Sequence, residues 1–454
     1  MKKTAAEMEQ NLAQSAARDK LVSLFDEDSF VELGKYVSKD GKDAAVISGY
    51  GTVDGISVYA YAQDSAVNSG AMSVSAAVKI KKIYELAQKN GAPVIGIFDS
   101  KGADMNEGMQ VLAAYSEITA ASAALSGVVP QIAVVDGVCA GTAAMTACMA
   151  DIVIMTEKSE LFMTAPFVAE DKTEGAGTAA AAAKSGVASI IAKDGEDALQ
   201  TAKKLIALLP ANNLEPADYF YETAENSAEI TASAKGIDLI KAIADTDSAV
   251  VLGKDFGENA VTALGSLNCR TVGFVGADSG NRLSKSDSAK IARFVGFCDA
   301  FSIPIITLID TEGFVLSSAD ELSGAVRDNA KLAQVYASAT APKIALITGK
   351  AYGSAYVAFA GSDISIAWAS AVISPASPEA AVTFLQGAAD ATETASRVAQ
   401  YEENEASPFT AASYGYIDRV IDPEETKAAI ISAVESSSGK RVASPARKHI
   451  NFVY

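Results

Sequence analysis

The chain has 454 residues, of which 56 are acidic and 37 are Lys or Arg, so its formal net charge is −19 at neutral pH. This length suits two or three domains, and a composition that is 49% apolar and 20% charged is typical of a folded globular protein. The acidity argues against a nucleic-acid partner, because nucleic-acid-binding domains usually present a basic face.

The histidine content excludes several kinds of catalytic site. The single histidine, His449, lies in a basic segment near the C-terminus. Serine or cysteine triads, histidine bases and histidine-bound metals all need a histidine inside the fold. We therefore expect chemistry without histidine or metal, and a solvated or interface position for His449.

The cysteines and the apolar segments indicate a cytoplasmic protein. The four cysteines form no CxxC pair, which favours small buried side chains in a reducing compartment. We expect no signal peptide, because the first 20 residues lack an apolar core. The longest uncharged run, residues 118–135, contains Ser, Pro and Gln and is too polar for a transmembrane helix.

The first half of the chain alternates predicted helices with short apolar runs. In chain order these are a helix over 77–89, a strand over 92–99, a helix over 107–125 and a strand over 130–137, followed by a small-residue helix from Gly141. Apolar, β-branched runs between helices indicate buried strands of an α/β fold.

The second half repeats this order 211 or 212 residues later, with helices expected over 289–301 and 319–338. The matching pairs are Asp99 and Asp310, Gly102 and Gly313, Pro130 and Pro342, Gly141 and Gly353, and Asp151 and Asp363. Matching residues that keep the same spacing over some sixty residues predict a tandem duplication. We expect a first domain over 1–213, an acidic connector over 214–246 and a second domain over 247–454.

Glycine-containing turns follow the predicted strands, at residues 100–105 and 137–143 in the first repeat. Glycine allows the backbone to approach a ligand closely, and a helix that begins after such a turn directs free N–H groups toward it. Two such turns together would form a pocket of backbone donors for an oxyanion. The alternative is that the glycines only allow close helix–strand packing.

The segments 102–105, 135–143 and 150–154 resemble the crotonase superfamily. The resemblance implies that the chain binds an acyl-CoA thioester and stabilises its enolate with two backbone N–H groups. These map to Ala103, after Gly102, and to Thr142, after Gly141. The hydratases of the superfamily also need glutamates, at positions that here hold Met145 and Ala165, which disfavours hydration.

The tandem pair resembles the carboxyltransferase subunits of biotin-dependent enzymes, such as propionyl-CoA carboxylase β and methylmalonyl-CoA decarboxylase α. The matching blocks run from residues 24–33 to His449 and include 63–64, 90–94, 209–213, 294–301, 350–353 and 415–423. The resemblance implies two crotonase-like domains that move a carboxyl group between biotin and a short-chain acyl-CoA (methylmalonyl/propionyl or malonyl/acetyl). Backbone donors polarise the substrates, and biotin accepts the proton.

The resemblance also assigns the second repeat and the ligand contacts. The biotin-side donors map to Phe314 and to Ser354 and Ala355, after Gly353. Val357 matches a position that lines the acyl pocket, although it could be an ordinary core valine.

The cations for the CoA phosphates are expected among Lys79, Lys81 and Lys82, unless these lysines form only a solvated helix face.

The expected protein partners are those that would supply the biotin carrier and the carboxylase activity. No Ala-Met-Lys-Met biotin motif and no ATP site of a carboxylase is evident. We therefore expect a separate biotin carboxyl carrier protein, together with biotin carboxylase or membrane decarboxylase subunits. The resemblance implies a homo-oligomer, from dimer to hexamer, with each site between the first repeat of one subunit and the second repeat of another.

The sequence departs from the family pattern at the expected turns. The usual Gly-Gly pairs are Gly141-Thr142 and Gly353-Ser354, an arginine is replaced by Asp104, and a proline is replaced by Glu312. A side chain at a site of close approach costs clearance, and a positive φ would strain it. Two alternatives therefore stay open: a non-catalytic scaffold paralogue, and a biotin-independent crotonase-type acyl-CoA enzyme.

Overall fold

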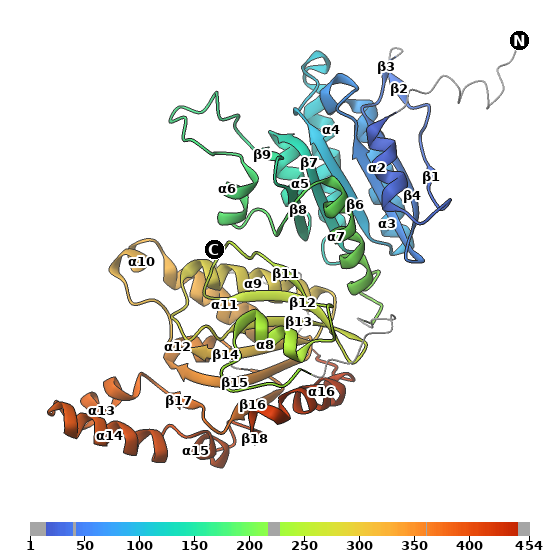
Figure 1. The fold of residues 1–454 in the computed structure, drawn as a ribbon. Helices are drawn as coiled ribbons and strands as arrows, with labels where there is room; N and C mark the ends of the chain where they lie inside the picture. The colour runs from blue at the N-terminus through green and yellow to red at the C-terminus, as the bar shows by residue number, and fades with distance from the viewer. Residues whose placement is uncertain (1–14, 40–41, 217–227, 360, 444–454) are drawn as a thin grey trace, which may run out of the picture. The chain divides into compact units, whose positions relative to one another are not determined.

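A computed structural model describes residues 15–39, 42–216, 228–359 and 361–443 (Figure 1). The chain divides into two compact units, residues 1–213 and 214–454. His449 lies outside the described residues. Among the described residues, no helix is long and apolar enough to cross a membrane.

The first unit contains a mixed eight-stranded sheet with the order β1-β4-β5-β6-β7-β8-β10, and β9 pairs with β7. An antiparallel pair, β4 and β5, leads into the parallel strands β5, β6, β7, β8 and β10. The strands are β1 (Val31–Glu32), β4 (Val46–Val53), β5 (Ile56–Gln63), β6 (Val94–Ser100), β7 (Gln131–Ala140), β8 (Ile152–Thr156), β9 (Glu160–Phe162) and β10 (Ile190–Ala192). A separate hairpin joins β2 (Ser38–Lys39) and β3 (Lys42–Asp43).

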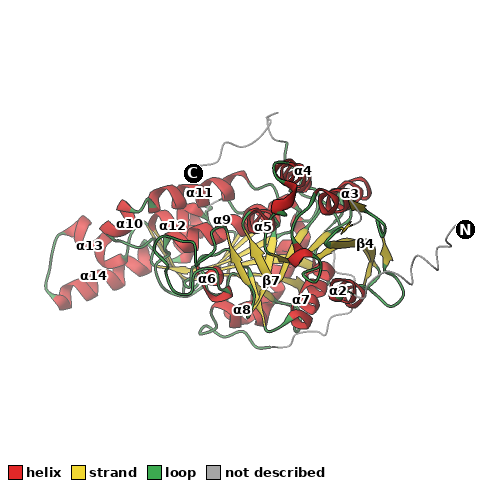
Figure 2. Cartoon of the chain, turned by 90° about the horizontal axis from the view of Figure 1, so that it is seen from above, coloured by secondary structure: helices red, strands yellow, loops and turns green. Residues whose placement is uncertain are grey.

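Helices cover both faces of this sheet, with α3 and α4 on one side and α2 and α7 on the other (Figure 2). They are α2 (Ala16–Leu24), α3 (Val74–Asn90), α4 (Gln110–Leu125), α5 (Thr142–Cys148), α6 (Ala179–Lys184) and α7 (Gly195–Leu208). Local sequence sets the ends of α3: the Ser73 hydroxyl accepts the Ala76 N–H, and Gly91 ends the helix at φ +60°. Ile80 and Ile83 of this helix are buried in the core.

The second unit repeats this plan, with strand order β11-β12-β13-β14-β15-β16-β18 and with β17 paired to β15. Its strands are β11 (Val250–Leu252), β12 (Val261–Leu267), β13 (Arg270–Ala277), β14 (Ile305–Thr311), β15 (Lys343–Tyr352), β16 (Ile364–Trp368), β17 (Val372–Ser374) and β18 (Arg419–Ile421). Its helices are α8 (Gly236–Ile243), α9 (Lys285–Ala300), α10 (Ser318–Leu322), α11 (Ala325–Ser338), α12 (Gly353–Ala358), α13 (Pro378–Gln386), α14 (Ala391–Asn404), α15 (Pro408–Ser413) and α16 (Thr426–Ser437).

The predicted tandem α/β duplication is confirmed by this shared strand order, and individual contacts repeat as well. The Asp151 carboxylate accepts the Gln131 N–H at 2.8 Å, and Asp363 accepts the Lys343 N–H at the same distance. Part of the stretch expected as a connector forms α8, whose Leu239, Ile240 and Ile243 are buried in the core of the second unit. These residues therefore pack as part of that unit.

An aspartate after the first parallel strand holds the preceding helix in each unit. Asp64, after β5, accepts the hydroxyl of Ser15 at the start of α2, at 2.6 Å. Asp278, after β13, accepts the N–H of Gly236 at the start of α8, at 2.8 Å. Asp278 is fully buried, and its Oδ1 has no hydrogen-bond partner among the described residues. Burial raises its pKa to about 6.

The substitution Asp278→Asn should stabilise the protein at pH 7. A carboxyl whose pKa is raised by folding binds its proton more tightly in the folded state, so stability falls as pH rises from about 4 through 6. The asparagine variant should lack this fall and gain up to about 3 kcal/mol at pH 7. Urea unfolding at pH 4 and pH 7 measures the difference.

Asp64→Asn is the matched control, because hydrogen bonds reach both oxygens of Asp64. It should give no gain. Equal stability of Asp278→Asn and the unmodified chain at pH 7 would contradict the account of Asp278.

Candidate active site

In each unit, two turns meet at the carboxyl ends of neighbouring parallel strands. In the first unit, a Cβ atom added to Gly102, after β6, would lie 3.5 Å from the carbonyl oxygen of Ala140, at the end of β7. In the second unit, a Cβ atom on Gly313, after β14, would lie 3.7 Å from the carbonyl oxygen of Tyr352, at the end of β15. The fold therefore brings the two predicted turns of each repeat together.

The turn after β6 leaves one backbone donor unused. Met72 forms an isolated parallel bridge with Ala103, in which the Met72 N–H binds Gly102 O and the Asp104 N–H binds Met72 O, both at 2.8 Å. This pattern directs the Ala103 N–H away from Met72. No described residue accepts a hydrogen bond from it.

The second unit repeats this geometry. Leu283 bridges Phe314, and the Leu283 N–H binds Gly313 O while the Val315 N–H binds Leu283 O, both at 2.9 Å. Among the described residues, none accepts the Phe314 N–H. A side chain adds a contact here, because Arg282 Nη1 donates to the Phe314 carbonyl at 3.2 Å.

The other turn of each pair begins a short helix. Gly141 has φ +62° and donates its N–H to Phe162 O, and Thr142 is the first residue of α5. Gly353 has φ +58° and begins α12, which places the N–H groups of Ser354 and Ala355 in its first turn. First-turn N–H groups have no partner within a helix and remain available to a ligand.

The altered Gly-Gly pairs do not strain the backbone. Positive φ falls on Gly141 and Gly353, while neither Thr142 nor Ser354 is among the residues with positive φ. Thr142 is half-buried and Ser354 is exposed. The substitutions therefore add a side chain near each turn but keep the backbone conformation that glycine requires.

An aspartate joins the two strands of each pair. Asp99 Oδ1 accepts the Val138 N–H at 3.3 Å, and Asp310 Oδ1 accepts the Lys350 N–H at 2.8 Å. Each carboxylate lies against a glycine of the neighbouring strand: a Cβ atom on Gly137 would lie 2.2 Å from Asp99 Oδ1. The sequence analysis identified both aspartates as matching positions of the two repeats but assigned them no role.

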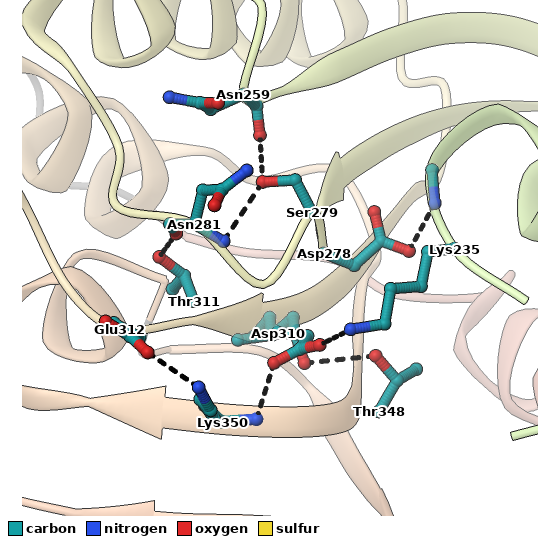
Figure 3. Close-up of polar contacts among 12 residues, drawn as sticks. Lys235, Asn259, Asp278, Ser279, Asn281, Asp310, Thr311, Glu312, Thr348 and Lys350 are labelled. Atoms are coloured by element: carbon teal, nitrogen blue, oxygen red, sulfur yellow. Dashed lines mark hydrogen bonds and ion pairs between the residues drawn. The ribbon is translucent and has the colours of Figure 1, made fainter. Parts of the chain in front are cut away.

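Charged side chains surround the turn of the second unit (Figure 3). Lys350 Nζ lies 2.6 Å from Glu312 Oε1, and Arg282 Nε lies 3.8 Å from Glu312 Oε2. The hydrogen bond from Lys350 lowers the pKa of the Glu312 carboxyl. Lys235 forms an ion pair with Asp310. Sequence reasoning noticed Glu312 as a departure from the family pattern but missed its two cationic neighbours.

The predicted ligand-contact residues differ in exposure. Val357 is 65% exposed on α12, so it is not a core valine in this unit, and its repeat counterpart Met145 is 43% exposed on α5. Lys79 is only 5% exposed, and burial lowers its pKa. Lys81 pairs with the Glu117 carboxylate at 3.0 Å.

Lys82 is exposed, and all three lysines border a cavity of about 340 Å³ beside α3. This cavity is also lined by Leu33, Gly34, Val37, Ser48, Val78, Glu85 and Glu117. Because its side chain is buried, Lys79 is a poor contact for a phosphate in solution, whereas Lys81 and Lys82 are accessible.

Comparisons with known proteins agree with this architecture. The profile of the carboxyl transferase domain matches residues 10–452. The α subunit of methylmalonyl-CoA decarboxylase from Veillonella parvula is 33% identical, with 96% of this chain and 92% of that protein covered. The β chain of propionyl-CoA carboxylase from Cereibacter sphaeroides is 36% identical, with 96% and 93% covered.

A solved structure has the same two-unit fold. The crystal structure of the transcarboxylase 12S hexamer with hydrolysed methylmalonyl-CoA superposes with a TM-score of 0.90 at 33% identity, covering 99% of this chain and 94% of that one. The predicted crotonase-like duplicated fold is thus confirmed.

The substitution Gly137→Ala should destabilise the chain, whereas Gly296→Ala, inside α9, should not. At Gly137 a methyl group would overlap the Asp99 carboxylate and displace it from Val138, at a cost of about 2 kcal/mol. At Gly296 nothing lies within 4 Å and φ is not positive, so alanine should stabilise the helix by up to about 1 kcal/mol. Urea unfolding of both variants measures the two effects, and equal stability of the Gly137→Ala variant and the unmodified chain would contradict the proposed contact.

Proposed function

The chain belongs to the carboxyl transferase domain family, and from this premise we propose that its first unit holds a short-chain acyl-CoA and its second unit holds biotin. The activity of the chain is biotin-dependent acyl-CoA carboxyl transfer. The observation that supports an oxyanion site in each unit is the repeated free donor, the N–H of Ala103 in one turn and of Phe314 in the other. The choice of ligand for each unit follows the family resemblance.

In the first unit, the Ala103 and Thr142 N–H groups would bind the thioester oxygen. Removing the α-proton, or losing a carboxylate from the α-carbon, moves negative charge onto that oxygen. A fixed backbone donor at such an oxygen contributes about 3 kcal/mol of transition-state stabilisation. This role needs no titratable side chain, which agrees with the absence of histidine from residues 1–448.

In the second unit, the N–H groups of Phe314, Ser354 and Ala355 would bind the ureido oxygen. When bound, biotin supplies the nitrogen that carries the carboxyl group and the base that takes the α-proton. The free Phe314 N–H fits this group, because a ureido oxygen accepts hydrogen bonds and gains negative charge as its nitrogen loses a substituent. Lys350 and Arg282 add positive charge beside the turn, which Glu312 partly neutralises.

The substrate contacts and partners extend the proposal. Lys81 and Lys82 would attract the CoA phosphates, and the exposed Val357 would border a short acyl group. We also propose a biotin carrier on a separate protein, with biotin carboxylase or membrane decarboxylase subunits as further partners, and a cytoplasmic location. By analogy with the 12S hexamer, subunits would assemble so that sites form between them.

The substitution Ala103→Pro should lower kcat about 100-fold, because proline has no N–H to offer the enolate oxygen. The lost N–H has no partner among the described residues, so the substitution breaks no hydrogen bond of the fold, and urea unfolding of the variant checks that the fold is kept. Ala103→Gly keeps the N–H and should stay within a few-fold of the unmodified chain. Steady-state kinetics of methylmalonyl-CoA decarboxylation with free biotin measures both, and an unchanged rate in the proline variant would refute the donor role.

Lys82→Ala should weaken CoA binding roughly threefold at low salt, as expected for one exposed charge pair, and less at high salt. Lys89→Ala, at the other end of α3, is the matched control and should have no effect. Calorimetric titration with CoA measures both affinities. Equal affinities for the two variants would contradict the assignment of Lys82 to the phosphate site.

A further inference from the structure

A buried hydroxyl residue ends the strand before each free donor. Ser100 is the last residue of β6 and Thr311 is the last residue of β14, and both are fully buried. They are repeat counterparts, so the duplication has kept a hydroxyl at this position in both units. Neither residue was a candidate in the sequence.

Each hydroxyl contacts both the N–H and the carbonyl oxygen of the same glycine. Ser100 Oγ accepts the Gly102 N–H at 3.2 Å and donates to Gly102 O at 3.3 Å. Thr311 Oγ1 accepts the Gly313 N–H at 3.3 Å and lies 3.2 Å from Gly313 O. The hydroxyl therefore closes a tight turn around a glycine with φ above +100°.

These contacts act on the peptide that carries the free donor. The carbonyl of Gly102 belongs to the same peptide unit as the Ala103 N–H, and it accepts from both Ser100 and Met72. Hydrogen bonds to a carbonyl polarise its peptide and strengthen the N–H at the other end. The hydroxyl thus fixes the direction of the donor and also increases its strength.

We propose that Ser100 and Thr311 are positioning residues for the two oxyanion donors, Ala103 N–H and Phe314 N–H. The proposal rests on the proposed function, in which those N–H groups bind the substrate and biotin oxygens. Both side chains are fully buried, so each hydroxyl acts through the turn that it closes.

The two units use the hydroxyl differently. Thr311 Oγ1 also lies 2.7 Å from Asn281 O (Figure 3), and a hydroxyl has one proton to donate. The shorter contact takes that proton most of the time, so Thr311 ties its turn to the loop after β13. Ser100 has no such competitor among the described residues and donates to its own turn. Loss of the hydroxyl should therefore affect donor strength more in the first unit and turn position more in the second.

The first-unit test compares Ser100→Ala with Ser122→Ala. Ser122 is equally buried, and its hydroxyl binds the Gln131 side chain away from the turns. The probes are propionyl-CoA and a nitronate analogue of its enolate, whose anionic oxygen needs the donor. Ser100→Ala should reduce the preference for the nitronate roughly tenfold, as expected when one donor is weakened but not removed. Ser122→Ala should keep the preference.

The second-unit test compares three variants on β14. Thr311→Val should lower kcat/KM for free biotin roughly tenfold and leave the nitronate preference unchanged. Thr311→Ser keeps the hydroxyl and should restore the rate. Thr307→Val removes a buried hydroxyl that binds Tyr336 at the other end of the strand, and should have no effect on either readout.

The outcomes separate this inference from the function on which it rests. If the unmodified chain prefers the nitronate and Ser100→Ala prefers it equally, Ser100 has no positioning role. If Thr311→Val and Thr311→Ser behave alike, the hydroxyl of Thr311 has none. If the unmodified chain binds the nitronate no more tightly than propionyl-CoA, the proposed oxyanion site itself is wrong and the inference falls with it.

Discussion

The site depends on one backbone constraint, an N–H group that the fold leaves without a protein partner. Folded chains satisfy nearly all of their buried N–H groups, so a fixed, unused donor needs a specific cause. Here the cause is a bridge between the turn and the segment before the next helix, formed by Met72 in one unit and Leu283 in the other. Each bridge uses the carbonyl before the donor (Gly102 or Gly313) and the N–H after it (Asp104 or Val315), and so leaves the N–H of Ala103 or Phe314 directed outward. The neighbouring strand then supplies a helix whose first N–H groups lie beside it.

The duplication has kept this backbone and changed the side chains around it. In the first unit the turn pair has an exposed methionine, Met145, where the second has Val357. In the second unit Lys350, Glu312 and Arg282 form a chain of ion pairs beside the turn. In a chain with net charge −19, a local group of cations at one pair of turns changes the field that a ligand meets there. The same backbone geometry can thus bind two different oxygen acceptors, and the side chains around each turn determine which ligand is preferred.

The sequence predicted the repeated elements and the turns well, because glycine, proline and apolar runs act locally. The helix expected over 77–89 extends over Val74–Asn90, and the strand expected over 92–99 is Val94–Ser100. The helix expected over 319–338 is divided into α10 and α11 at Gly324, whose φ is +85°. The roles of Ser100 and Asp99 could not be predicted, because they depend on contacts with backbone groups of folded turns and of the neighbouring strand. Lys79 is likewise buried and therefore is not one of the accessible lysines. Its burial could not be predicted, because it depends on how the completed unit packs.

The most direct test of the account is product analysis after the purified chain is incubated with methylmalonyl-CoA, with and without free biotin. If the backbone donors of both units are functional, propionyl-CoA should form, and its formation should require biotin. Formation of propionyl-CoA at the same rate without biotin would contradict the role given to the second unit. Absence of product under both conditions, with acyl-CoA still bound, would contradict the claim that the altered turns remain catalytically competent.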